Sequence, residues 1–394
     1  MSRKNRIPEL DGFRALAIGL VAWYHIWQQS WLTPRFFGTS MDFLVRPGYI
    51  FVDATVLLSA FLLFLPYVQA HRAGQPLPDT RRFYERRVQR IIPSYYFFTL
   101  AMLFLVAIPT AQYVTAGDMA KDVAMHLSFT FMFSRNTYLY TPLGAASWTL
   151  CMECLMYIPF PYIARACLKN RTGVWGMMLA ITGFFRVWVM FTMDTYGMVV
   201  NQLINFLDVY AIGMASAWFY CWLKDKLSPI TGWKKLYYQL PATALWVLSL
   251  FLLQPVIQHQ AWTSGQDALQ MAQFIRRTPL ACLYALFLLS LLFSVQPLRW
   301  IFGNPVTKYL SAISMNYYLI HQPLAVQLKR LHIPDYVSDM PNVTGEIDWQ
   351  LKYTALCFIA PIVIATLMTF LIEKPCSYLL GKGFEKLRSR KKAA

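Results

Sequence analysis

Apolar runs of about 20 residues recur along this chain of 394 residues, and a run of that length crosses a lipid bilayer as a helix. Hydrophobic residues make up 57% of the chain and charged residues only 14%, against about 25% charged in a typical soluble domain. We therefore predict an all-α, polytopic integral membrane helix bundle. The predicted spans, about ten in number, are 12–30, 49–69, 91–109, 147–165, 173–192, 202–222, 240–257, 278–296, 309–328 and 351–372.

The distribution of Lys and Arg predicts how these spans are oriented. With a cytoplasmic N-terminus, the cytoplasmic segments hold most of the basic residues. These are Arg3, Lys4 and Arg6; Arg72, Arg81, Arg82, Arg86, Arg87 and Arg90; Lys169 and Arg171; Lys224, Lys226, Lys234 and Lys235; Arg299 and Lys308; and those from Lys374 onward. The opposite loops hold few, among them Arg35, Arg46, Arg276 and Arg277. The positive-inside rule then predicts that both termini are cytoplasmic, with one domain over 1–394 that ends in a basic tail at 373–394.

The distribution of charge argues against a nucleic-acid-binding protein, and the distribution of cysteines argues against a disulfide-stabilised or metal-binding one. Proteins that bind nucleic acid gather Lys and Arg on one soluble face, whereas the net charge of +17 is spread here between apolar runs. We therefore expect no nucleic-acid partner. The seven cysteines are scattered, which argues against a disulfide framework. Cys151 and Cys154 have no further Cys or His nearby, so we expect no metal.

Ionisable residues inside the apolar spans usually mark functional sites, and six of them fall at nearly one depth. At about 1.5 Å per helical residue, His25 lies about 20 Å from the cytoplasmic end of its span. Asp53 and Glu153, in spans that run the other way, lie about 6–8 Å from the outer end of a core about 30 Å thick. The other three are Arg186, Asp208 and His321. The pattern predicts a polar chamber inside the bundle.

Arg14 and His25 share the first span. They are separated by eleven residues, or about three turns plus 20°, so both side chains face the same way about 16 Å apart. One helix face would then join the cytoplasmic side to the chamber. The alternative is that Arg14 extends to the interface and His25 is a hydrogen-bonded core residue.

Six segments together resemble the acyltransferase family 3 membrane enzymes, and they occur in the order typical of that family. The segments are LDGFRALAIGLVAWYH, FVDATVLLSAFLL, FYERRVQRIIPSYY, SWTLCMECLMYIPFP, ISMNYYLIHQP and LIEKP, which together extend from residue 10 to 375. The chain departs from the family pattern at Ala60, where members have glycine, and at Cys154 and Leu155, where many have Glu-Gln. Residues 223–277 match no motif.

This resemblance implies an O-acyltransferase in the plasma (inner) membrane of a bacterium. Its donor would be cytoplasmic acyl-CoA, commonly acetyl-CoA, and its acceptor a hydroxyl of an extracytoplasmic glycan, a glycolipid or a related molecule. Arg86, Arg87 and Arg90 would bind the phosphates of coenzyme A, because guanidinium groups bind phosphate oxygens in pairs. The alternative is that these arginines anchor the chain to anionic lipid.

The resemblance and the chemistry of acyl transfer together suggest a role for each polar residue. His25 would be the general base, or else a transient acyl carrier. Glu153 would orient the imidazole or position the acceptor hydroxyl. Arg14 would hold the donor or stabilise developing charge. Residues expected to line the chamber are Asp53, Ser59, Trp148, Tyr318 and His321.

Two other functions remain open on the sequence alone. A secondary transporter or channel could use the polar residues as a permeation pathway, although transporters often show related halves and we find no internal repeat. A family member without catalysis could serve as a membrane partner or sensor. The acceptor, the acyl chain length and the oligomeric state are not encoded in any motif.

Overall fold

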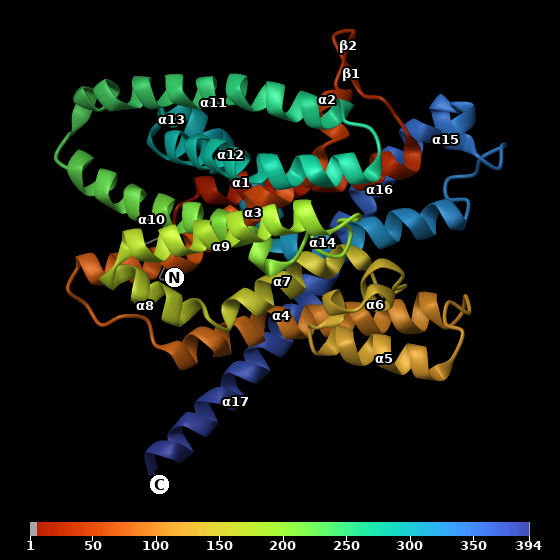
Figure 1. The fold of residues 1–394 in the computed structure, drawn as a ribbon, viewed down its shortest axis with the longest axis horizontal. Coiled ribbons are helices and arrows are strands. Elements are labelled where there is room, and N and C mark those ends of the chain that lie inside the picture. Colours follow the sequence, from red (N-terminus) through yellow and green to blue (C-terminus); the bar gives the residue numbers. More distant parts are fainter. Residues whose placement is uncertain (1–5, 394) are drawn as a thin grey trace. The chain divides into compact units, whose positions relative to one another are not determined.

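The structure, a computed structural model, describes residues 6–393 and is built mostly of helices (Figure 1). The strands among these residues form a short antiparallel hairpin of β1 (Arg35–Phe36) and β2 (Thr39–Ser40). The helices are α1 (Glu9–Ser30), α2 (Asp42–Val45), α3 (Val52–Arg72), α4 (Thr80–Met102), α5 (Ala116–Leu127), α6 (Arg135–Leu139), α7 (Trp148–Tyr157), α8 (Phe160–Lys169), α9 (Arg171–Thr192), α10 (Leu207–Leu227), α11 (Leu236–Trp262), α12 (Gln266–Phe293), α13 (Gln296–Phe302), α14 (Pro305–Arg330), α15 (Pro341–Thr344), α16 (Ile347–Leu367) and α17 (Lys374–Ala393). A π-helical segment, Met368–Glu373, joins α16 to α17. Arg3 and Lys4 of the predicted basic N-terminus lie outside the described residues.

Helices form at every predicted span, and seven of the described helical segments are long and apolar enough to cross a membrane. These seven are Gly48–Arg72, Thr80–Ala107, Arg171–Thr192, Leu203–Leu227, Gly232–Trp262, Gln266–Phe293 and Ile347–Arg390. The other three predicted spans are occupied by α1, by α14 and by the pair α7 and α8. The prediction of a multi-pass helical chain is confirmed, whereas the number of ten spans and the cytoplasmic termini stay predictions.

The predicted span 147–165 is not one continuous helix. α7 ends at Tyr157 and α8 begins at Phe160, and each has ten residues. Pro159 accounts for the break, because proline has no backbone N–H and its ring clashes with the carbonyl four residues earlier in a helix. The carbonyl of Ile158 accepts a hydrogen bond from the Tyr84 hydroxyl of α4 at 2.6 Å. This segment therefore differs from the simple span that its hydropathy predicts.

α12 begins twelve residues before the predicted span 278–296. It starts at Gln266, so Arg276 and Arg277 lie inside a helix, and their predicted position in an outer loop is wrong. The Arg277 side chain is 2% exposed and pairs with Asp53 of α3 at 3.2 Å. Two adjacent arginines interrupt the apolar pattern, and the sequence does not show that a carboxylate from a distant helix neutralises one of them.

The chain divides into two compact units, each built from two segments of sequence. Unit 1 consists of Met1–Leu77 and Tyr162–Ala312, and unit 2 of Pro78–Pro161 and Ile313–Ala394. In unit 1, α3 packs against α10, and α11 packs against α12. In unit 2, α17 packs against α4 (Figure 1). The single-domain organisation of the chain stays a prediction.

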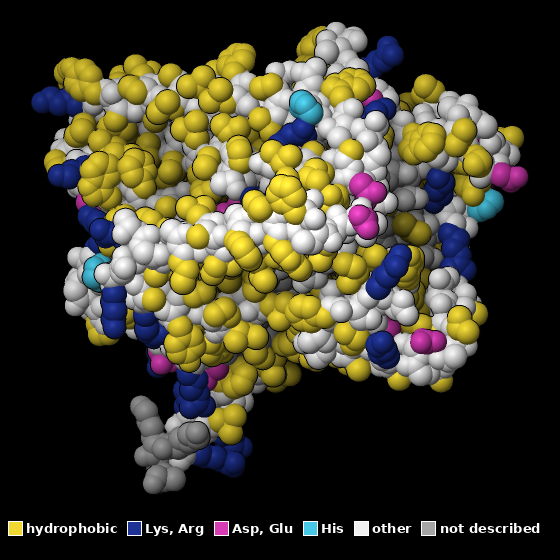
Figure 2. Space-filling view, viewed as in Figure 1, with side chains coloured by type: hydrophobic (Ala, Val, Ile, Leu, Met, Phe, Trp, Pro, Cys, Tyr) yellow, Lys and Arg dark blue, Asp and Glu magenta, His cyan; other side chains and the backbone are white. Residues whose placement is uncertain are grey.

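Hydrophobic side chains cover the surface along α9 and α11 (Figure 2). Phe184 and Phe191 of α9 and Phe251 of α11 are all more than two-thirds exposed. An exposed apolar patch of this extent on a soluble protein would favour association or aggregation. On these helices it indicates contact with lipid, in agreement with their length.

The contact between α3 and α10 depends on a residue without a side chain. A Cβ atom added at Gly213 of α10 would lie 2.5 Å from the Leu57 carbonyl oxygen and 2.7 Å from the Ala60 Cβ of α3. Small residues at such contacts let helix backbones approach closely in membrane proteins. Ala60 therefore preserves a close approach although it replaces the glycine of the family pattern.

We expect Gly213→Ala to destabilise the protein by about 1–3 kcal/mol, because the added methyl group meets backbone atoms that cannot move aside. The measurement is a thermal melt of the detergent-solubilised protein. Gly183→Ala in α9 is the matched control, since a Cβ there would have nothing within 4 Å. Equal melting temperatures for the two variants would show that the α3–α10 contact tolerates the methyl group.

Candidate active site

The two residues that the sequence places on one face of the first span, Arg14 and His25, do lie on one helix, α1. Both side chains are partly buried. Nδ1 of His25 lies 3.0 Å from Oε1 of Gln28, and Nε2 of Gln28 donates to the Tyr24 hydroxyl at 2.8 Å. With the amide in this orientation, its oxygen accepts a hydrogen bond from the Nδ1–H group. The other ring nitrogen, Nε2, then carries the lone pair that a general base needs.

A second hydrogen-bonded group in unit 1 adjoins Tyr24. The rings of Tyr24 and Tyr49 meet edge to face, with centroids 4.9 Å apart. The Tyr49 hydroxyl accepts a hydrogen bond from Gln260 of α11 at 2.6 Å, and the Gln260 oxygen accepts one from Arg276 of α12. Arg276 also contacts Nδ1 of His259. Hydrogen bonds thus link α11 and α12 to Tyr49, and a ring contact links Tyr49 to Tyr24 of α1.

Asp53, predicted to line a chamber, is held in a buried ion pair. Its carboxylate lies 3.2 Å from Nε of Arg277, and both side chains are less than 8% exposed. Arg277 also donates to the Val200 carbonyl at 2.8 Å and lies 4.0 Å from the centroid of the Phe206 ring. Each partner of the pair therefore has its charge compensated inside unit 1, as a buried charge requires. Ser59, on the same helix, is partly buried.

A second buried ion pair lies in the same unit. Arg186 of α9 donates to Asp208 of α10 at 2.8 Å and to the Asn205 side chain at 2.6 Å. Thr278 of α12 also donates to the Asp208 carboxylate. Asp53 interacts electrostatically with both members of this pair. Three of the six residues predicted at one depth are thus brought together, and they are joined by Arg277.

Glu153 is the centre of a polar cluster in unit 2. Its carboxylate accepts a hydrogen bond of 2.7 Å from the Tyr157 hydroxyl, one turn along α7. The guanidinium carbon of Arg87 lies 5.1 Å from the centroid of the Tyr157 ring and 5.2 Å from that of Phe83. Arg87 also acts electrostatically on Glu153. The predicted acid and one of the predicted phosphate-binding arginines therefore belong to one cluster.

Two further predicted residues lie beside this cluster. Tyr318 of α14 makes a side-chain hydrogen bond with Thr149 and interacts electrostatically with Glu153. His321 is fully buried, with Nδ1 2.7 Å from the Tyr318 carbonyl and its ring stacked on Tyr317 at 6.0 Å. The packing of His321 is that of a core residue. Trp148, at the start of α7, is partly buried.

The three predicted phosphate-binding arginines differ in exposure. Arg86 and Arg90 are exposed, whereas Arg87 is partly buried between aromatic rings. Arg90 also acts electrostatically on Glu373, whose carboxylate accepts hydrogen bonds from Asn316 at 2.8 Å and from Ser94 at 3.5 Å. Of the three arginines, Arg86 and Arg90 are therefore the two with exposed side chains.

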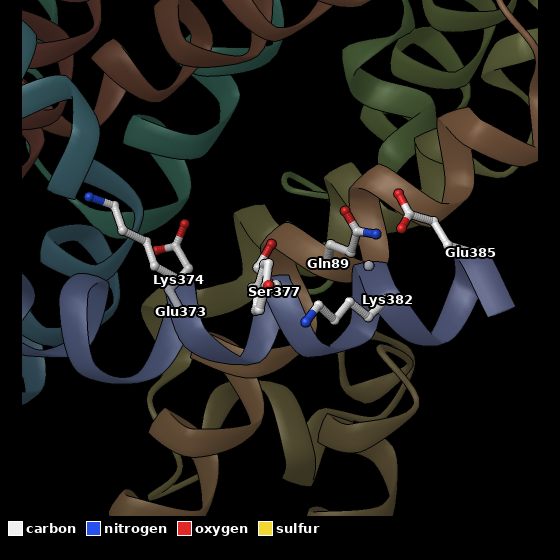
Figure 3. A pocket seen from close by; sticks show the side chains of 8 residues that line it. Gln89, Glu373, Lys374, Ser377, Lys382 and Glu385 are labelled. Atoms are coloured by element: carbon white, nitrogen blue, oxygen red, sulfur yellow. The ribbon is translucent and has the colours of Figure 1, made fainter.

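A cleft of about 400 Å³ lies between α4 and α17, close to these arginines in sequence (Figure 3). Its lining residues are Gln89 of α4 and Glu373, Lys374, Ser377, Tyr378, Gly381, Lys382 and Glu385 of the C-terminal helical segment. α17 is fixed to α4 by an ion pair of 2.8 Å between Arg388 and Glu85. Among the described residues, no group of three or more His, Cys, Asp or Glu side chains is placed to hold a metal ion.

Sequence reasoning missed several members of these clusters. Gln28 and Tyr157 lie three and four residues from His25 and Glu153, spacings at which helical side chains meet, so the sequence did contain that signal. Gln260 and Arg277 are more than 200 residues from Tyr49 and Asp53 and lie where no family motif occurs. No local pattern could have identified these two contacts.

Comparison with known proteins identifies the family. Residues 7–370 match the family described as an acyltransferase domain. Peptidoglycan O-acetyltransferase OatA of Listeria monocytogenes is 23% identical over 382 residues, which cover 94% of this chain and 55% of the relative. O-acetyltransferase OatA of Staphylococcus aureus is 25% identical over 164 residues, or 40% of this chain and 24% of the relative.

The chain thus spans about half of the length of the Listeria relative and less of the Staphylococcus relative. No solved structure matches the chain. The family match covers nearly all of the chain and includes five of the six segments that carry the resemblance, since LIEKP begins at residue 371. This chain belongs to the acyltransferase 3 family.

Proposed function

We propose that this protein is a membrane O-acyltransferase that transfers the acyl group of cytoplasmic acyl-CoA, acetyl-CoA first among them, to a hydroxyl of an extracytoplasmic glycan or related acceptor. The proposal places it in the plasma (inner) membrane with both termini in the cytoplasm. The named relatives make peptidoglycan the first acceptor to test. Family membership supports the reaction class, and the geometry around His25 supports the mechanism.

The observation that carries the mechanism is the contact between His25 and Gln28. When Nδ1 donates to the Gln28 oxygen, a neutral imidazole carries its lone pair on Nε2, which can take the proton of an acceptor hydroxyl. The hydroxyl oxygen then attacks the thioester carbonyl carbon and forms a tetrahedral oxyanion. When this intermediate collapses, the C–S bond breaks, and the leaving CoA thiolate takes the proton back from His25. Arg14, on the same helix, is the proposed cation for the donor or for the oxyanion.

Arg86 and Arg90 are proposed to bind the donor phosphates. Both are exposed on the N-terminal half of α4, and Gln89 between them lines the cleft against α17. Lys374 and Lys382 add positive charge to that cleft. The pyrophosphate and 3′-phosphate of coenzyme A need such cations, because they cannot enter hydrocarbon.

Arg87 has a different proposed role from its two neighbours. It is partly buried against Tyr157, which in turn donates to Glu153. Arg87 therefore holds the Glu153–Tyr157 pair in place. A carboxylate oxygen can accept a further hydrogen bond, and this suits Glu153 to orient an acceptor hydroxyl or an imidazole.

We expect the double variant Arg86→Gln and Arg90→Gln to raise the donor KM about tenfold or more with little change in kcat, since each charge-assisted bond contributes about 1.5–3 kcal/mol. The assay measures release of free CoA and formation of O-acetyl ester in proteoliposomes that contain acetyl-CoA and peptidoglycan fragments. Lys226→Gln, an exposed cation of α10, is the control for loss of charge. An unchanged donor KM would show that the two arginines serve as a lipid anchor. Failure of the wild-type protein to consume acetyl-CoA would instead favour a transporter.

A further inference from the structure

The end of unit 1 where α1 and α11 finish and α12 begins carries a partly buried cation, Arg276, that makes no ion pair with a described carboxylate. Among the ion pairs of residues 6–393, Arg277 has Asp53 and Arg46 has Asp42 at 3.1 Å, but Arg276 is in none. Its contacts are two neutral acceptors, Gln260 and His259. A partly desolvated guanidinium without a counter-charge is unfavourable until an anion binds to it.

Arg276 is connected to the proposed base by contacts between side chains. Arg276 donates to Gln260, Gln260 donates to Tyr49, and the Tyr49 ring meets Tyr24. Tyr24 contacts both the His25 ring, with centroids 5.0 Å apart, and Gln28, which holds the imidazole. An acceptor bound at Arg276 therefore lies in the same side-chain network as the group that would take its proton.

The same end of the unit presents tryptophans beside a second cation. The guanidinium carbon of Arg46 lies 5.3 Å from the Trp27 ring centroid and 5.8 Å from that of Trp262. Trp262 is 63% exposed, and Trp31, at the end of α1, is 51% exposed. Flat aromatic faces beside cations suit a ring-shaped, hydroxylated, anionic ligand, because the ring packs on the indole while the charge pairs with arginine.

The segment that supplies Arg276 and Trp262 contains none of the six segments that carry the family resemblance. Residues 223–277 carry no family motif, yet they provide His259, Gln260, Trp262 and Arg276. Recognition of the acceptor is expected outside the six motif segments, since those segments carry the residues proposed for the common chemistry.

We propose that this end of unit 1 is the acceptor site, that the acceptor is an acidic sugar, and that Arg276 pairs with its carboxylate or phosphate while Trp262 packs on the sugar ring. The inference rests on the proposed acyl transfer and adds the charge of its acceptor. Gln260 is a positioning residue that holds Arg276 against Tyr49. In the proposed orientation this end faces away from the cytoplasm.

The test is direct binding of defined sugars to the full-length protein in nanodiscs, measured by calorimetry. The probes are trigalacturonic acid, its uncharged counterpart galactotriose, and galactose 6-phosphate with galactose as its counterpart. We expect at least one acidic probe to bind about tenfold more tightly than its neutral counterpart, since hydrogen bonds to a charged group are the stronger kind. The acidic probe that shows this preference identifies the anion as carboxylate or phosphate.

Variants separate the two contacts. Arg276→Gln should abolish the preference for the acidic probe and leave the affinity for the neutral probe unchanged, whereas Arg276→Lys should retain part of it. Trp262→Ala should weaken acidic and neutral probes by a similar factor, and its exposed position makes misfolding no concern. Lys226→Gln should bind all probes as the wild type does.

Equal affinity for charged and neutral probes, absence of binding by any of them, or a preference that survives Arg276→Gln would each overturn the proposal. The binding measurement needs no turnover, so it is independent of the proposed reaction. The reaction is monitored separately, by measuring the slow release of CoA from acetyl-CoA in the absence of an acceptor. If CoA is released and no preference for acidic sugars exists, the acceptor inference alone fails.

Discussion

Replacement of His25 by alanine is expected to lower kcat for acyl transfer by about 10²–10⁴, the usual contribution of a general base. The donor KM is expected to stay within about twofold of the wild type, because the cations proposed to bind the nucleotide lie elsewhere in the sequence. The measurement is formation of O-acetyl ester in proteoliposomes with acetyl-CoA and peptidoglycan fragments. Gln28→Ala should give a smaller loss, about tenfold, because the imidazole remains but its tautomer and orientation are no longer fixed.

His71→Ala is the matched control for the His25 variant. His71 is an exposed histidine of α3 whose ring lies 6.0 Å from that of Trp218, so its loss removes an imidazole without touching α1. Normal turnover by His25→Ala, with normal protein levels, would remove the proposed base. Covalent acetyl-His25 trapped after rapid quenching would instead establish the transient-carrier mechanism.

Disruption of the Asp53–Arg277 pair is expected to have the largest effect on stability. Asp53→Asn leaves the Arg277 charge buried without its partner, and breaking a buried pair in this way costs about 3–5 kcal/mol. Because Asp53 also acts on the Arg186–Asp208 pair, we expect α3, α9, α10 and α12 to loosen together. The measurement is a thermal melt in detergent together with the amount of protein recovered from membranes.

Two further variants test whether the expected loss of stability comes from leaving a buried charge without its partner. The double variant Asp53→Leu and Arg277→Met removes both charges and should recover much of the stability. Asp348→Asn removes one member of an exposed pair with Lys352 on α16, so its effect should be below about 1 kcal/mol. Equal loss in Asp53→Asn and Asp348→Asn would contradict the proposed importance of the buried pair.

The sequence predicted well those features that depend on local spacing. The spacing of eleven positions from Arg14 to His25 requires only that one helix run without a break, and α1 does so from Glu9 to Ser30. The family segments likewise located Glu153 and Arg87, which the structure places in one cluster with Tyr157. In each case the decisive information lies within a few helical turns.

The sequence failed where a charge is neutralised by a distant helix. Arg276 and Arg277 look like the end of an apolar span, because the cost of a buried cation depends on a partner that hydropathy does not register. Asp53 is 224 residues from Arg277, and the contact emerges only when α3 and α12 are placed together. The role of 223–277 could not be read for the same reason, since Gln260 contacts Tyr49 and Arg277 contacts Asp53, both more than 200 residues away.

The break at Pro159 also affects how the residues next to Glu153 are held. A carbonyl at the end of a helix needs a donor from outside the helix, and the Tyr84 hydroxyl supplies one to Ile158. Tyr84 and Arg87 are three residues apart in α4, and they contact the adjacent residues Ile158 and Tyr157. One short stretch of α4 therefore makes two contacts with the residues just before the break. The position of the Glu153 carboxylate therefore depends on contacts that α4 makes with Tyr157 and Ile158, and not on Glu153 alone.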